Sequence, residues 1–282
     1  MKKTKLLSII VALMMVVVFA VGCSSTPEPA PAPEEPKQEE PKEPEAPALS
    51  GEVMIAAAAS LENAFVDELI PMFNEENPDV KITGTYDSSG KLQTQIESGL
   101  KAQIFFSAAM KQMNELVEGG FINEADVTKL LLNEVVLITG TATTTTVTDF
   151  GNIADAATIA IGDPASVPAG QYAQEVLTSL GSWDAVNAKA SLGTNVTEVL
   201  SQVAEGSAEV GIVYATDAAS MADKVKVLAV APEGSLATPV IYPVALTADS
   251  TAEQTDASKA FIEFLKGPEA LKVFEKFGFK SA

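Results

Sequence analysis

Histidine and arginine are absent from the 282-residue chain, and cysteine occurs once, at Cys23. Zinc, copper and iron sites are built mainly from imidazole and thiolate ligands, so sites of this kind are largely excluded. A Ser-His-Asp or Cys-His catalytic system is excluded as well, because it requires a histidine base. Paired carboxylates could still perform acid–base chemistry. The composition therefore favours a protein that is not an enzyme and has neither cofactor nor directly coordinated metal cation.

Positive charge is also scarce. All eighteen basic residues are lysine, and against 38 acidic residues they leave a formal net charge of −20. A nucleic-acid partner would require a basic face, so none is expected. Hydrophobic residues make up 47 % of the chain, which is enough to bury a sizeable core.

The N-terminus has the pattern of a secretory signal. Three lysines within the first five residues precede a run from Leu6 to Gly22 that is apolar except for Ser8, and Cys23 follows directly. The ending Ala20-Val21-Gly22-Cys23 resembles the lipobox of bacterial lipoproteins, although alanine at its first position is a departure. This resemblance implies that residues 1–22 are a signal peptide and that lipidated Cys23 anchors the protein to the cell membrane. An uncleaved transmembrane helix is the alternative, because a largely apolar run of seventeen residues lies at the lower limit for spanning a bilayer. Both interpretations place the rest of the chain outside the cytoplasm.

Residues 24–50 contain eight of the sixteen prolines, interspersed with glutamates. Such a composition cannot form a core and predicts a disordered, locally polyproline-like linker. Together with Cys23 it forms a tether, residues 23–50, whose extended reach is roughly 80 Å at ~3.1 Å per residue.

From residue 51 onward, short apolar runs alternate with longer amphipathic ones. This alternation predicts an α/β fold with a mostly parallel sheet. The predicted strands are Val53–Ala57, Val80–Thr85, Ile104–Ser107, Val135–Thr139, Thr158–Ile161, Glu209–Tyr214, Val225–Val230 and Val240–Leu246. The predicted helices are Leu61–Glu76, Lys91–Gly99, Lys111–Glu118, Gln171–Leu180, Thr197–Glu205, Ala252–Leu265 and Pro268–Phe277.

Small polar or turn residues stand at several strand-to-helix junctions. Examples are Ser60, the Ser88-Ser89-Gly90 sequence, the Pro168-Ala169-Gly170 sequence and Asn195. Ligands of open α/β sheets bind beyond the carboxyl ends of strands, where these junctions lie. Helix N-termini offer unpaired N–H groups and partial positive charge, so several of them together could bind an anion without a cationic side chain. Serine and asparagine are also ordinary helix N-caps, so the pattern alone leaves both interpretations open.

Longer motifs at the same junctions are specific enough to indicate a protein family. In order, they are AAAASLENAF (56–65), YDSSGKLQTQIESG (86–99), IFFSA (104–108), GDPASVPAGQYAQEVLTSLGSWD (162–184), EVGIVYATDA (209–218) and YPVAL (242–246). Together they resemble the periplasmic molybdate-binding proteins of bacterial ABC importers, over essentially all of residues 51–282. With the lipobox in front, the chain resembles the lipoprotein form of that receptor.

The resemblance implies the two-lobed, type II periplasmic binding protein fold, with mixed sheets flanked by helices and the ligand in the interlobe cleft. One lobe would comprise residues 51–134 plus 241–282, and the other residues 135–240. The chain would cross between them near Asn133–Val136 and Pro239–Tyr242. A monomer is expected.

The family holds a tetrahedral oxyanion with hydroxyl and backbone N–H groups. Matched motif by motif, the resemblance implies that Ser60 and Ser89 offer hydroxyl and amide groups. Ala169 and Val196 would donate backbone N–H groups, and Tyr214 its phenol. Molybdenum would thus be bound as molybdate, with no direct contact to a metal cation.

The implied function is capture of molybdate, and of tungstate as well, for delivery to an ABC permease. The nearest alternative is the same fold binding sulfate or another tetrahedral oxyanion. A carboxylate-dependent hydrolase and a surface adhesin rank lower, because donors rather than paired acids stand at the helix starts.

Three positions depart from the family pattern. Gln103 and Ala109 stand where aspartates are common, so local capping is expected to differ. Asp87 places a negative charge beside the expected anion site, and its side chain is expected to point outward.

Overall fold

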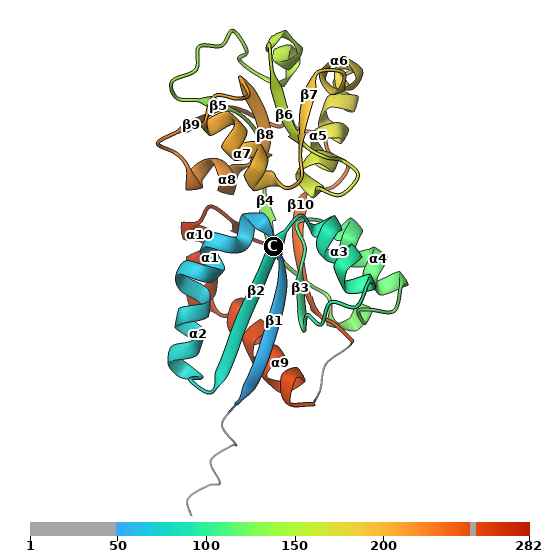
Figure 1. Cartoon of the computed structure of the whole chain (residues 1–282), viewed down its shortest axis with the longest axis vertical. Coiled ribbons are helices and arrows are strands. Elements are labelled where there is room, and N and C mark those ends of the chain that lie inside the picture. Colours follow the sequence, from blue (N-terminus) through green and yellow to red (C-terminus); the bar gives the residue numbers. More distant parts are fainter. Residues whose placement is uncertain (1–48, 249–251) are drawn as a thin grey trace, which may run out of the picture. The chain divides into compact units, whose positions relative to one another are not determined.

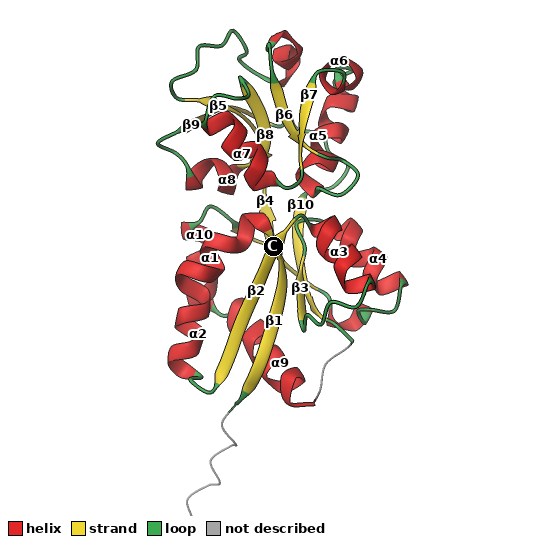
Figure 2. Cartoon of the chain, in the orientation of Figure 1, coloured by secondary structure: helices red, strands yellow, loops and turns green. Residues whose placement is uncertain are grey.

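A computed structural model describes residues 49–248 and 252–282, which belong to the compact unit Pro47–Ala282. The predicted signal peptide, Cys23 and most of the predicted linker lie outside the described residues. The unit is built from two sheets, each with helices beside it (Figures 1 and 2). We call the first sheet with its helices lobe 1 and the second sheet with its helices lobe 2.

The sheet of lobe 1 has six strands in the order β11-β4-β10-β3-β1-β2. Strand β1 pairs in parallel with β2 and β3, whereas β10 runs antiparallel to β3 and β4, and β11 runs antiparallel to β4. The strands are β1 (Gly51–Ala58), β2 (Val80–Asp87), β3 (Ile104–Phe106), β4 (Thr128–Asn133), β10 (Val240–Leu246) and β11 (Lys280–Ser281).

The sheet of lobe 2 has five strands in the order β7-β6-β8-β5-β9. Strand β6 is parallel to β7 and β8, and β5 is antiparallel to β8 and β9. The strands are β5 (Val135–Gly140), β6 (Ile159–Gly162), β7 (Ala190–Gly193), β8 (Val210–Tyr214) and β9 (Val225–Val230).

The α/β class and the two mixed sheets are confirmed, but the expectation of mostly parallel pairing, drawn from the alternation alone, is wrong. The chain crosses between the sheets at Glu134, between β4 and β5, and returns into β10 at Val240. A strand that enters a sheet from the other lobe starts at the opposite end, so β5 and β10 run against their neighbours. The two crossings lie side by side, because Val240 pairs with Asn133.

Seven longer helices match the predicted ones to within a few residues. In lobe 1 they are the first helix, residues 59–76, then α3 (Ser89–Glu97), α4 (Met110–Glu118), α9 (Ala252–Lys266) and α10 (Pro268–Lys276). In lobe 2 they are α5 (Pro168–Ser179) and α7 (Val196–Ala204). The short helices α6 (Trp183–Asn187) and α8 (Ala215–Ser220) were not predicted.

In the first helix, the spacing of the buried apolar residues coincides with a widened helical turn. Leu61, Phe65, Leu69 and Phe73 are spaced by four residues, and all are buried. A spacing of four drifts around a regular helix of 3.6 residues per turn. A π-helical segment at Phe65–Leu69 lies between α1 (Glu62–Ala64) and α2 (Ile70–Glu76) and widens the turn. The wider turn helps these side chains stay on one buried face.

Within the described ranges, no helix combines the length and the apolar character that crossing a membrane requires.

Candidate functional site

A cavity of about 200 Å³ lies where strands of both sheets end. Its wall follows the carboxyl ends of β1, β2 and β3 in lobe 1 and of β6, β7 and β8 in lobe 2. The lining residues are Ala58, Ala59, Ser60, Asp87, Ser88, Ser89, Ala108, Val167, Pro168, Ala169, Val196 and Tyr214. All five predicted oxyanion contacts are therefore brought together. Only about 10 Å³ of it is open to the centre of a water-sized sphere, far below the 300–1,000 Å³ typical of sites for drug-sized ligands, so its size favours a small ion.

Two lobe 1 hydroxyls are held in place by neighbours that leave their protons available. Ser89 is fully buried, and its Oγ accepts a hydrogen bond from the Ala108 N–H at 3.0 Å. Ser60 Oγ lies 2.8 Å from the Tyr242 hydroxyl, which accepts from Asn133 Nδ2 at 3.2 Å. If the Tyr242 hydroxyl donates its hydrogen bond to Ser60 Oγ, the hydroxyl hydrogens of both serines are free to be donated into the cavity.

Two further hydroxyls in the cavity wall are buried without any hydrogen-bond partner, Ser88 Oγ and Tyr214 Oη. A buried polar group left unpaired costs about 1–3 kcal/mol, so these atoms indicate where a hydrogen-bonding ligand belongs. Burial, with smaller effects of Tyr242, Tyr172 and Asp217, raises the pKa of Tyr214 well above its ordinary value. Its hydroxyl thus remains a donor.

Ser88 lines the cavity but is not among the five contacts expected from the sequence. It is 4 % exposed and adjoins Ser89 in the same motif. The family resemblance assigned only one serine of that motif to the anion. Two adjacent serines at a helix start were the available signal.

Lobe 2 contributes mainly main-chain donors. Ala169 and Val196 lie in the first turns of α5 and α7, where N–H groups lack partners inside the helix. The N-terminus of α7 is fixed by its cap, since Asn195 Oδ1 accepts from the Glu198 N–H at 2.9 Å. Each of α3, α5 and α7 brings about half a positive elementary charge to its start. No lysine lines the cavity among the described residues.

Asp87 is one of the residues that line the cavity, and its side chain is 27 % exposed. Its Oδ1 accepts hydrogen bonds from the Ser88 N–H at 2.7 Å, from Lys91 Nζ at 3.3 Å and from Asn195 Nδ2 at 3.3 Å. These donors offset its negative charge beside the site.

The other two departures have local consequences in lobe 1. Gln103 Oε1 accepts from the Met54 N–H at 2.7 Å, so the glutamine supplies an acceptor to β1. Ala109 caps α4 without a side-chain hydrogen bond, while Ser107 Oγ accepts from the Ala109 N–H at 3.2 Å. Neither Gln103 nor Ala109 lines the cavity.

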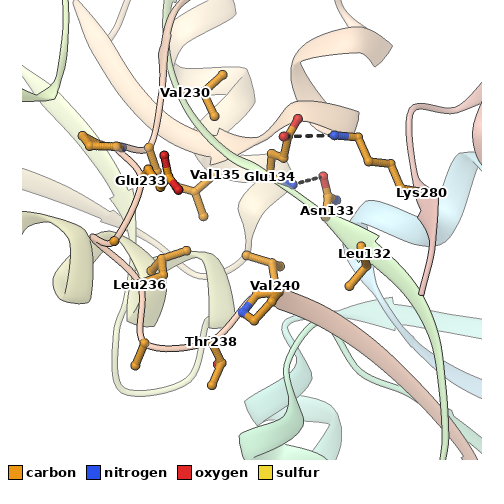
Figure 3. A pocket seen from close by; sticks show the side chains of 15 residues that line it. Leu132, Asn133, Glu134, Val135, Val230, Glu233, Leu236, Thr238, Val240 and Lys280 are labelled. Carbon is orange, nitrogen blue, oxygen red and sulfur yellow. Dashed lines mark hydrogen bonds and ion pairs between the residues drawn. The ribbon is translucent and has the colours of Figure 1, made fainter.

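A larger hollow, of about 890 Å³, opens beside the two crossings (Figure 3). We call it the hinge hollow; its wall consists of residues 132–135, 230–234 and 236–240 with Lys280. Leu132, Val135, Leu236 and Val240 make much of it apolar, and the Glu134–Lys280 ion pair of 3.0 Å lies at its edge (Figure 3). Since no helix start opens into it, the hinge hollow is a poor candidate for an anion site.

Within the described part of the chain, no three His, Cys, Asp or Glu side chains gather as they would around a metal ion. The donor set of the small cavity suits an anion instead.

Comparisons with known proteins agree with this geometry. A lipoprotein of Bacillus subtilis, YvgL, described as a candidate ABC transporter substrate-binding protein, is 40 % identical over 225 residues, covering 80 % of this chain and 85 % of that protein. The molybdate-binding protein ModA of Escherichia coli is 36 % identical over 235 residues, covering 81 % and 89 %. A solved structure from Clostridium difficile, described as the substrate-binding domain of a candidate molybdenum ABC transporter, superimposes with a TM-score of 0.61 at 37 % identity, covering 82 % and 99 %.

Residues 53–280 match the family described as bacterial extracellular solute-binding protein. With a two-sheet fold and a donor-lined cavity between the lobes, the chain belongs to this family.

Proposed function

We propose that the protein captures molybdate outside the cytoplasm, binds tungstate as well, and delivers its ligand to an ABC import permease without catalysing a reaction. The observation that carries this proposal is the cavity where donors from both lobes converge and two buried hydroxyls lack partners. The names of the Escherichia coli and Clostridium difficile proteins support molybdate as the ligand.

The proposed contacts are the five residues that the family resemblance implies, and all five are among the residues that line the cavity. Ser60 and Ser89 donate hydroxyl and amide hydrogens from lobe 1. Ala169 and Val196 donate backbone N–H groups from lobe 2, and Tyr214 donates its phenolic hydrogen. Because contacts come from both lobes, the anion itself stabilises the state in which the lobes touch, and a permease can recognise that state.

Neutral donors suit a receptor that must release its cargo. They fix the size of the anion and its hydrogen-bond pattern without adding a fixed counter-charge to the cavity. An anion that can accept several hydrogen bonds at once is favoured, which is a property of every tetrahedral oxyanion.

Thermal unfolding of the unit Pro47–Ala282 tests the proposal, with molybdate, tungstate, sulfate and phosphate added in turn. Tight binding should raise the unfolding free energy by about 4 kcal/mol when the anion is at a thousand times its Kd. The largest rise is expected with molybdate and tungstate. A rise with sulfate alone would assign the site to sulfate, and no rise with any oxyanion would refute the proposal.

The proposed receptor is tethered to the cell membrane. Residues 1–22 act as its signal peptide, lipidated Cys23 as its anchor and residues 23–50 as its spacer. The head is a monomer with one lobe from residues 51–134 plus 241–282 and the other from residues 135–240. Labelled fatty acid should enter the full chain in a bacterial host and fail to enter the Cys23→Ala variant. Equal labelling of both chains would contradict the anchor.

A further inference from the structure

Two hydrogen bonds join the lobes at the crossings, from Asn133 Nδ2 to Thr216 Oγ1 and from the Ala215 N–H to the Glu134 carbonyl. Three more join them across the cleft, without using the proposed oxyanion donors. The Gly90 N–H donates to the Ser166 carbonyl at 2.9 Å, and Gln112 Nε2 donates to Gln171 Oε1 at 3.1 Å. The third is the bond from Asn195 Nδ2 to Asp87 Oδ1 at 3.3 Å. The lobe 1 partners lie at the end of β2 and in α3 and α4, so these contacts share one side of the cleft.

The Asp87 carboxylate is the charged member of this set. Its side chain is 27 % exposed, and its Oδ1 also accepts from the Ser88 N–H and from Lys91. Across the cleft, the N–H of Glu198 donates to the cap residue Asn195. Hydrogen bonds from the Thr194 N–H and hydroxyl, with a smaller effect of the Lys91 charge, lower the pKa of Glu198. Lys91 therefore interacts both with Asp87 in its own lobe and with Glu198 in the other lobe.

Asn195 uses both ends of its amide. Oδ1 accepts from the Glu198 N–H and caps α7, while Nδ2 donates to Asp87 in the other lobe. The next residue, Val196, lies in the cavity wall. An aspartate could replace the cap but has no hydrogen to donate to Asp87.

We propose that Asp87 and Asn195 form an interlobe latch that stabilises the closed arrangement whether or not an anion is bound. They are positioning residues, because they act on the closed population and on the start of α7 rather than on the anion. Apparent affinity scales with the fraction of molecules that are closed, so the latch tightens anion binding. The effect on anion affinity rests on the proposed function, whereas the effect on closure does not.

The decisive variant is Asn195→Asp, which keeps the α7 cap and sets two carboxylates against each other. In small-angle scattering without any anion, the unit Pro47–Ala282 should become more extended. Its affinity for molybdate in calorimetric titration should fall about tenfold, as expected for losing a charge-assisted hydrogen bond.

The reversed pair Asp87→Asn with Asn195→Asp should recover both properties, since Asn at 87 can donate to Asp at 195. The matched control is Asn123→Asp, which makes the same change at an exposed cap of lobe 1, where Oδ1 accepts from the Ala125 N–H at 3.1 Å. This control should alter neither scattering nor affinity.

Unchanged scattering in Asn195→Asp, or failure of the reversed pair to recover, would overturn the latch. If molybdate fails to bind the wild-type protein while the scattering changes follow expectation, the latch stands and the proposed function falls. The melting temperature of each variant without anion shows whether it is folded.

Discussion

The two lobes line one cavity with different kinds of donor. Lobe 1 supplies serine hydroxyls at the ends of β1 and β2, whereas lobe 2 supplies backbone N–H groups at the starts of α5 and α7. Tyr214 is the one side-chain hydroxyl that lobe 2 contributes to the described cavity wall. A point mutation can delete a hydroxyl, but it can remove a main-chain donor only by moving the backbone or by introducing proline.

This difference extends to the glycines at two helix starts. Gly170 in α5 packs inside lobe 2, where an added Cβ would lie 2.0 Å from the Gly162 carbonyl oxygen. Gly90 in α3 faces the other lobe, where an added Cβ would lie 2.4 Å from the Ser166 carbonyl oxygen. Substitution by alanine should therefore damage the fold at Gly170 and affect only lobe closure at Gly90.

Gly170→Ala should have the largest effect. The clash is with backbone inside one lobe, so α5 must shift and carry the Ala169 N–H with it. Overpacking of this kind costs about 1–3 kcal/mol of stability. Urea unfolding without anion should show that loss, and calorimetry should show that molybdate binding is abolished. Wild-type stability in this variant would mean that α5 can move without consequence.

Tyr214→Phe should weaken binding without harming the apo protein. A hydrogen bond to a charged ligand contributes about 2 kcal/mol, so the anion-induced rise in unfolding free energy should shrink by that amount. Apo stability should stay constant or increase, since the variant removes a buried hydroxyl that has no partner.

Ser89→Ala is the lobe 1 counterpart and should differ in the apo state. It should reduce the anion-induced rise to a similar extent. It also removes the acceptor of the Ala108 N–H and should therefore lower apo stability by about 1 kcal/mol. Equal apo stability of Ser89→Ala and Tyr214→Phe would contradict the view that only the lobe 1 hydroxyl has a hydrogen-bond partner in the apo protein.

Gly90→Ala should reduce affinity about tenfold through closure alone. Alanine is a better helix former than glycine by up to about 1 kcal/mol, so apo stability should be maintained or raised. Calorimetric titration, with urea unfolding of the apo protein, separates these effects. A loss of apo stability like that of Gly170→Ala would show that Gly90 is required for lobe 1 itself.

Asp217→Asn should give an effect on stability that changes with pH. Burial raises the pKa of Asp217 from 3.8 to about 7, although a hydrogen bond from the Tyr214 N–H opposes the shift. Between these values the folded protein holds a proton that the unfolded chain has released. The Asp217 contribution to stability is therefore fully present below about pH 4 and lost as the pH rises to about 7.

The stability of Asp217→Asn relative to wild type should accordingly rise between pH 4 and pH 7 and then level off. Urea unfolding of both proteins across this pH range measures that difference. The contributions of the other carboxyl groups cancel because both proteins contain them. A difference that does not vary with pH would show that Asp217 has an ordinary pKa.

The sequence predicted most of the fold because its apolar periodicities are strong. The spacing of Leu61, Phe65, Leu69 and Phe73 indicated the first buried face, and the runs at β9 and β10 gave those strands their observed bounds. Strands β4, β7 and β11 were not predicted. Strands β7 and β11 are short and largely exposed, whereas only Glu134 separates β4 from β5, so no turn marks the end of β4. Helix α8 escaped because it begins directly after β8, without a loop to mark its start.

The site was predictable where donors follow from helix starts and family motifs. The hydrogen bonds made by Asp87 and Ser89 were not, because they join these side chains to distant segments. Asp87 meets Asn195 across 108 positions of the chain, and Ser89 meets Ala108 across 19. Periodicity carries no information about such pairings.

The hinge hollow makes this protein suited to engineering as an optical sensor. Its wall combines both crossings, so its shape must respond when the lobes rotate about them. Val230 lies in that wall with 52 % of its surface exposed, and the unit Pro47–Ala282 contains no cysteine. Val230→Cys therefore offers a single thiol for an environment-sensitive dye, at a position that is not part of the lining of the anion cavity.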